Sequence, residues 1–119
     1  MTRINIYFSA ISALQWTSSN SVRDGSSLYV CEGKTVNLNF EYVLENGEEI
    51  VSVEWIFNGN SDEVIAFLTH NAFAPMPAFS GRVQEGSTNG GIVLSHVTPA
   101  SSGNYTIEVR KFSLTRFLF

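Results

Sequence analysis

The stretch SSGNYTIEV, residues 101–109, decides the fold of this chain. It opens with a turn-forming Ser-Ser-Gly sequence and continues as an alternation in which Tyr105, Ile107 and Val109 are the apolar residues. A repeat of two residues is the pattern of a β-strand that buries one face. We therefore expect a strand here, with these three side chains in a core and the residues between them on the outer surface.

The same alternation recurs from residue 28 onward. It is clearest over residues 36–42 and returns over residues 51–57, where it ends at the turn Asn58-Gly59-Asn60. Residues 71–80 hold two of the three prolines and are expected to be irregular. Shorter strands are expected at 28–31, 64–68, 82–84, 92–97 and, after a tight turn at 111–113, up to Phe119. Many short strands joined by tight turns favour antiparallel hairpins in a β-sandwich.

The amino-terminal residues 1–27 have a less regular pattern than the rest of the chain. Residues 1–27 are expected to form an edge strand, with Ile4, Ile6 and Phe8 on one face, followed by a polar loop at 17–27. The alternative is that residues 1–14 are a leader remnant, because a short basic start precedes a mixed apolar stretch. The main domain is then residues 28–119.

Composition limits the classes of function. A chain of 119 residues, 44% apolar and 15% charged, is a single folded domain and not a disordered segment. Its net charge of −4 argues against a nucleic-acid partner. No run of 18 apolar residues is present, so we expect no direct membrane contact by this domain.

The sequence contains no group of residues typical of a catalytic site. His70, His96 and Cys31 are too few for a structural zinc site, and neither histidine has a nucleophile motif near it in the sequence. The acidic pairs Glu48-Glu49 and Asp62-Glu63 are expected in turns, where carboxylates usually face water. We therefore predict no enzyme activity, no catalytic or metal-binding residues and no cofactor.

Taken together, these segments resemble a variable-type immunoglobulin domain. Val53-Glu54-Trp55 looks like strand C with its tryptophan, and residues 101–107 resemble the Asp-x-Gly-x-Tyr-x-Cys pattern of strand F, with Tyr105 as the tyrosine corner. Strands B, D and E correspond to residues 33–40, 79–83 and 91–97. The resemblance implies an all-β, immunoglobulin-like β-sandwich of variable type, with two antiparallel sheets and Greek-key connections.

The chain departs from that pattern at its cysteines and at one acid. Phe40 and Ile107 stand where the two core cysteines usually are, so the sandwich is expected to have no core disulfide. Removing such a bridge costs roughly 2–5 kcal/mol, and burying each apolar replacement returns roughly 1.5–3 kcal/mol. We expect Phe40, Trp55, Tyr105 and Ile107 to form the core that replaces it. Ser101 stands in place of the usual acid, which leaves Arg82 without its usual partner.

Two further residues bear on an extracellular location. Cys31 is either a small buried hydrophobe on an edge strand or a partner for a cysteine outside residues 1–119. Asn104-Tyr105-Thr106 is an N-glycosylation sequon, which would place a glycan on Asn104 at the turn before strand F.

Three families share this loss of cysteines in a first domain: hydroid allorecognition receptors, SLAM-type lymphocyte receptors and carcinoembryonic-antigen-related adhesion molecules. The chain looks most like the first, on its Tyr-Val-Cys-Glu-Gly, Ala-Phe-Ser-Gly-Arg-Val and Asn-Gly-Gly segments. The resemblance implies the extracellular, membrane-distal domain of a single-pass cell-membrane receptor of adhesion or immunity. Its partner is then a protein, the same domain on an opposing cell, bound as a weak homodimer. The alternatives are a secreted immune-type binding protein and a heterophilic immune-cell receptor.

Strand parity predicts where such a partner binds, on the sheet formed by strands G, F, C and C′. Acidic residues gather on one side of that face and basic residues at the F–G hairpin, so a two-fold contact can pair each patch with its opposite. An apolar centre is expected between them. The candidate face comprises Glu54, Ile56, Asp62, Glu63, Ile65, Phe67, Glu108, Arg110, Lys111 and Arg116.

Overall fold

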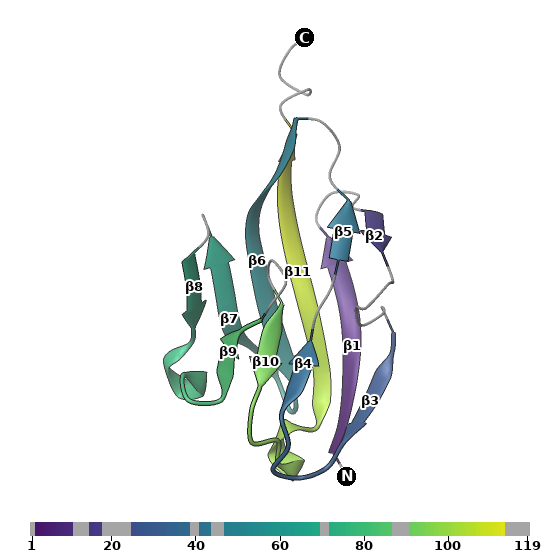
Figure 1. Ribbon diagram of the computed structural model, residues 1–119, viewed down its shortest axis with the longest axis vertical. Helices are drawn as coiled ribbons and strands as arrows, with labels where there is room; N and C mark the ends of the chain where they lie inside the picture. The colour runs from purple at the N-terminus through teal and green to yellow at the C-terminus, as the bar shows by residue number, and fades with distance from the viewer. Residues whose placement is uncertain are drawn as a thin grey trace.

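The computed structural model describes residues 2–10, 15–17, 25–38, 41–43, 47–69, 72–86 and 91–113. Every element in these ranges is a β-strand or a short 3-10 helix (Figure 1). In chain order they are β1 (Thr2–Ala10), β2 (Gln15–Thr17), β3 (Ser27–Val30), β4 (Val36–Leu38), β5 (Glu41–Val43), β6 (Glu48–Asn58), β7 (Asp62–Thr69), β8 (Ala72–Pro75), η1 (Pro77–Phe79), β9 (Val83–Glu85), β10 (Ile92–Leu94), η2 (Pro99–Ser101) and β11 (Gly103–Ser113).

The strands form two facing layers (Figure 1). The larger layer is a six-stranded sheet in the order β3-β1-β11-β6-β7-β8, and the smaller is a three-stranded sheet in the order β4-β10-β9. A short pair, β2 with β5, forms a separate two-stranded sheet. The protein is therefore an all-β sandwich of the immunoglobulin-like kind.

The core lies between the two layers. Trp55 of β6 and Ile107 of β11 are cross-strand partners, and they belong to one buried cluster with Leu38 and Ile92 of the smaller sheet. The buried apolar residues are Ile4, Ile6, Leu38, Val53, Trp55, Ile65, Ala66, Val83, Ile92, Leu94, Val97, Tyr105, Ile107 and Val109. Phe40, which was expected in this core, lies outside the described residues.

β1 has a different place from the one expected. It lies inside the large sheet, between β3 and β11, and not at an edge. It runs antiparallel to β3 but parallel to β11, so the expectation of purely antiparallel sheets is wrong at this one pair. Ile4 and Ile6 are both fully buried, so the apolar face of β1 forms part of the core at this internal position.

Several strand bounds also differ from the expected ones. β11 continues to Ser113 beside β6, with a bulge between Arg110 and Lys111, so the expected turn at 111–113 is wrong. The single strand expected over 36–42 is divided into β4 and β5, which belong to different sheets. The proline-containing stretch 71–80 is not wholly irregular, since it contains β8 and η1.

Gly103 shows why β11 begins where it does. Its φ is 151°, and a Cβ built there would lie 2.6 Å from the carbonyl oxygen of Asn58 and 2.9 Å from the Phe57 ring. Only glycine fits such a close approach to the end of β6. The glycine therefore allows β11 to start in register with β6, which places Tyr105 and Ile107 in the core.

Candidate binding face

The outer face of the large sheet carries an apolar row across four strands. Cross-strand partners point to the same side of a sheet, and the register pairs Tyr7 of β1 with Thr106, Thr106 with Ile56, and Ile56 with Val64. Tyr7 is 43% exposed and Val64 is 37% exposed, so both remain accessible to a partner. We call Tyr7, Ile56, Val64 and Thr106 the apolar row.

A charged row lies one step along the strands. Glu108 of β11 is the direct partner of Glu54 of β6, so two carboxylates face the same side at neighbouring positions. Arg110 contacts Glu108 with a nitrogen–oxygen distance of 3.9 Å, and its own side chain is 58% exposed. Within the described ranges no cation comes within ion-pair distance of Glu54. Two carboxylates and one guanidinium leave an excess negative charge among these three side chains, and the direct opposition of Glu54 and Glu108 is unfavourable.

A polar row lies on the other side of the apolar row. Asn5, Asn104, Asn58 and Asp62 follow one another across β1, β11, β6 and β7. The Asn5 amide donates to Asn104 Oδ1 at 2.9 Å, and the Asn58 amide donates to Asp62 Oδ1 at 2.7 Å. These bonds hold the side chains against their own sheet. Asn104 lies in β11 itself and not in a turn before it.

Two residues expected on this face lie elsewhere. The register between β6 and β7 shifts between Trp55 and Ile56, so Ile65 and Ala66 are both buried opposite Trp55. Ile65 is 1% exposed and belongs to the core. Glu63 is the partner of Phe57, which packs inward on Tyr105 with ring centroids 4.7 Å apart, so Glu63 lies on the inner side of the sheet.

The other expected residues fall into two groups. Phe67 is half-buried and pairs with Glu54, and therefore borders the charged row on the outer face. The side chain of Lys111 and the whole of Arg116 lie outside what the structure describes. Tyr7 and Val64 were missed, although the alternation of Ile4 and Ile6 already implied that Tyr7 points to the opposite side of β1.

Tyr105 makes the contact expected of a tyrosine corner. It is 3% exposed, and its hydroxyl donates to the Ser101 carbonyl oxygen at 2.7 Å. Burial raises the pKa of the Tyr105 hydroxyl well above its usual value, while the nearby positive charge of Arg82 opposes that rise. The hydroxyl therefore stays protonated and acts as a donor across the physiological pH range.

Replacing Tyr105 with phenylalanine is expected to lower the free energy of unfolding by about 0.5–1.5 kcal/mol, because the Ser101 carbonyl loses its donor. Urea unfolding followed by circular dichroism measures this change. Tyr7→Phe is the matched control, since the Tyr7 side chain is exposed. Equal stability of the two variants would show that water satisfies the Ser101 carbonyl instead.

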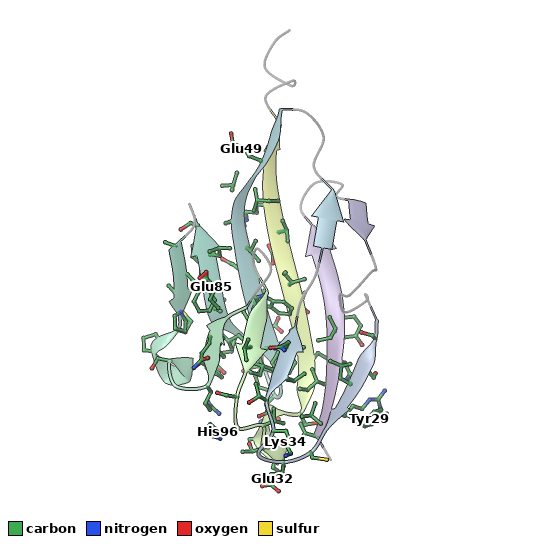
Figure 2. The ribbon with its side chains drawn as sticks, in the orientation of Figure 1. Tyr29, Glu32, Lys34, Glu49, Glu85 and His96 are labelled. Atoms are coloured by element: carbon green, nitrogen blue, oxygen red, sulfur yellow. The ribbon has the colours of Figure 1, made fainter. Side chains whose placement is uncertain are left out.

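Cys31 and the histidine that the structure describes both lie at the surface. Cys31 is exposed, so the expectation of a buried hydrophobe is wrong. His96 is exposed and lies in a turn after β10, with a φ of 52°, near the end of the sandwich that also carries Glu32 and Lys34 (Figure 2). Among the described residues no His, Cys, Asp and Glu side chains gather into a metal-binding group. No helix in those ranges has the length and apolarity needed to cross a membrane.

Comparison with known proteins agrees with this architecture. No family model and no curated protein matches the sequence. Among solved structures, that of murine CRIg matches with a TM-score of 0.67 and 16% sequence identity, over 87% of each chain. That similarity extends across most of both chains, and it supports an immunoglobulin-like fold of variable type for this protein.

Proposed function

We propose that this chain is the extracellular recognition domain of a cell-surface receptor and that it binds a copy of itself on an opposing cell. The supporting observation is the apolar row Tyr7, Thr106, Ile56 and Val64, bordered on one side by Glu54, Glu108 and Arg110. An apolar centre with a charged border is the composition of a protein–protein contact.

The arrangement of charge suits a two-fold contact. In such a contact each residue of one copy meets a different residue of the other, and the relation is reciprocal. Glu54 has no cation partner among the described residues, whereas Arg110 is exposed and makes only a long contact with Glu108. Arg110 of one copy can therefore neutralise Glu54 of the other, twice per dimer, while the apolar rows pack between them.

The pair is expected to be weak. Surface ion pairs contribute only about 0–1 kcal/mol each, and the apolar row is small. Micromolar or poorer affinity suits contact between two cell surfaces, because many weak contacts act together there. A glycan on Asn104 would lie in the polar row, on this same face, and would direct the contact toward the charged row.

Charge exchange tests the proposal. Beads coated with the Glu54→Lys variant, or with Arg110→Glu, are expected to aggregate less than wild-type beads, because each change places like charges opposite one another. Mixed beads carrying the two variants are expected to aggregate better than either variant alone, since the mixture restores opposite charges.

The controls change charge away from this face. Glu85→Lys and Lys34→Glu alter exposed residues outside the large sheet, on β9 and before β4, and should leave aggregation unchanged (Figure 2). Melting temperatures establish that each variant is folded. Unchanged aggregation of both face variants, or no recovery in the mixture, would rule out self-recognition through this face.

A further inference from the structure

A cavity of about 220 Å³ lies between the two sheets, at the end of the sandwich that holds η2. Its apolar wall includes Phe57, Ile65, Phe79 and Leu94, and its polar lining includes Glu63 and Arg82. A second hollow of about 410 Å³ is also lined by Phe57, Glu63 and Ala100, so the two adjoin each other. A dry cavity of about 150 Å³ is enough for benzene, so this one has room for a ring and several further atoms.

Because Ser101 carries no charge, it gives Arg82 no ion-pair partner at this position. The resemblance to variable-type domains places an acid at this position, where it would pair with the arginine. Here the Ser101 hydroxyl accepts a hydrogen bond from the Thr98 backbone N–H at 3.1 Å and brings no charge. Arg82 instead makes a 3.4 Å bond to the Ala78 carbonyl and lies 4.9 Å from the centre of the Phe79 ring. No carboxylate in the described ranges pairs with it.

Glu63 supplies the opposite charge at the same cavity. Its pairing with Phe57 places it on the inner side of the sheet, yet its side chain stays exposed. It too has no ion-pair partner within the described part of the chain. The cavity therefore combines an apolar wall with a guanidinium and a carboxylate that each lack an ion-pair partner in the described part of the chain. Two opposite charges that do not pair with each other select a molecule that carries both.

We propose that this cavity binds a small zwitterion with an apolar body, of the class of the apolar α-amino acids. The ligand carboxylate accepts hydrogen bonds from the Arg82 guanidinium, and its ammonium group donates to Glu63. The apolar side chain packs against Ile65, Phe79 and Leu94. This site is separate from the outer face of the sheet, so it does not depend on self-recognition.

Three probes of similar size test the charge requirement: L-phenylalanine, 3-phenylpropionate, which lacks the ammonium group, and phenethylamine, which lacks the carboxylate. Titrations followed by backbone amide NMR shifts are expected to show L-phenylalanine binding about tenfold more tightly than either analogue, with the shifts near Arg82 and Tyr105. No saturable shift with L-phenylalanine would overturn the proposal. Equal binding of all three probes would also overturn it, because only apolar contact would then remain.

Variants of the two charged residues assign the contacts. Arg82→Gln should reduce the affinity for L-phenylalanine about tenfold and leave phenethylamine unchanged. Glu63→Gln should do the same to L-phenylalanine and leave 3-phenylpropionate unchanged. Both side chains are exposed, so both variants should fold. The opposite pattern, or no change in either variant, contradicts the assignment.

Two variants of Ser101 that differ only in charge test whether the missing acid makes Arg82 available to the ligand. Aspartate and asparagine can both accept the Thr98 hydrogen bond, but only aspartate brings a charge for Arg82. Ser101→Asp should weaken L-phenylalanine binding about tenfold or more, and Ser101→Asn should leave it within about twofold of wild type. Equal affinities in the two variants would show that Arg82 is not the anion-binding group.

Discussion

Replacing Trp55 with alanine is expected to lower the free energy of unfolding by roughly 3–5 kcal/mol. Trp55 is 1% exposed, and it pairs across the sheet with Ile107, where the usual disulfide would lie beside it. Truncating it leaves a large cavity at the centre of a sandwich that has no such cross-link. Chemical unfolding followed by far-ultraviolet circular dichroism measures the loss.

Tyr29→Ala provides the control for this large-to-small change. Tyr29 points away from β3 into solvent and is 60% exposed (Figure 2). Its removal should change the free energy of unfolding by less than about 1 kcal/mol, including the loss of its contact with Arg3. A Trp55→Ala variant as stable as Tyr29→Ala would show that the sandwich does not close around Trp55.

Ile6→Asp is expected to prevent cooperative folding, or to destabilise the protein by more than about 4 kcal/mol. Ile6 is fully buried and pairs with Tyr105 near the start of β11. An aspartate there loses the apolar contact and places a carboxylate in the core. Thermal unfolding followed by circular dichroism measures the effect.

The neighbouring residue is the control for β1. Tyr7 points to the outer surface, so Tyr7→Asp should cost less than about 1 kcal/mol. A difference between adjacent aspartates is expected only if β1 is a strand with one buried face. Equal, small effects of both changes would mean that β1 is not part of the sheet.

Periodicity alone predicted most of the strands and part of the core. Trp55, Tyr105 and Ile107 stand at alternate positions of long strands, and burial of an apolar face is a local property of such a pattern. The position of Ile65 could not be predicted in this way. One extra residue in β7 changes which side chains face inward beyond it, and no residue type marks that point. Glu63 lies before that point, and strict alternation from Asp62 places it on the inner side.

The place of β1 was also beyond local sequence patterns. Its alternation showed which face is apolar but not which strand lies beside it, because Asn5 and Asn104 are neighbours across 99 positions of the chain. In β11, the polar residues Lys111 and Ser113 suggested a turn, but pairing with β6 continues to Ser113 and keeps the strand extended. Tertiary pairing overrode local preference at both places.

The parallel pairing of β1 with β11 also constrains the order of folding. Pairing residues that are 99 positions apart closes a very long loop. The chain loses conformational entropy on closing that loop before the contacts between β1 and β11 can compensate for it. During synthesis β1 is made early, but its partner on one side emerges only after the other strands of both sheets. The face of β1 that carries Ile4 and Ile6, which is buried in the folded protein, stays exposed to water until β11 is available. We therefore expect insertion of β1 to be a late and slow step, and chains halted before it to carry an open strand edge that favours aggregation.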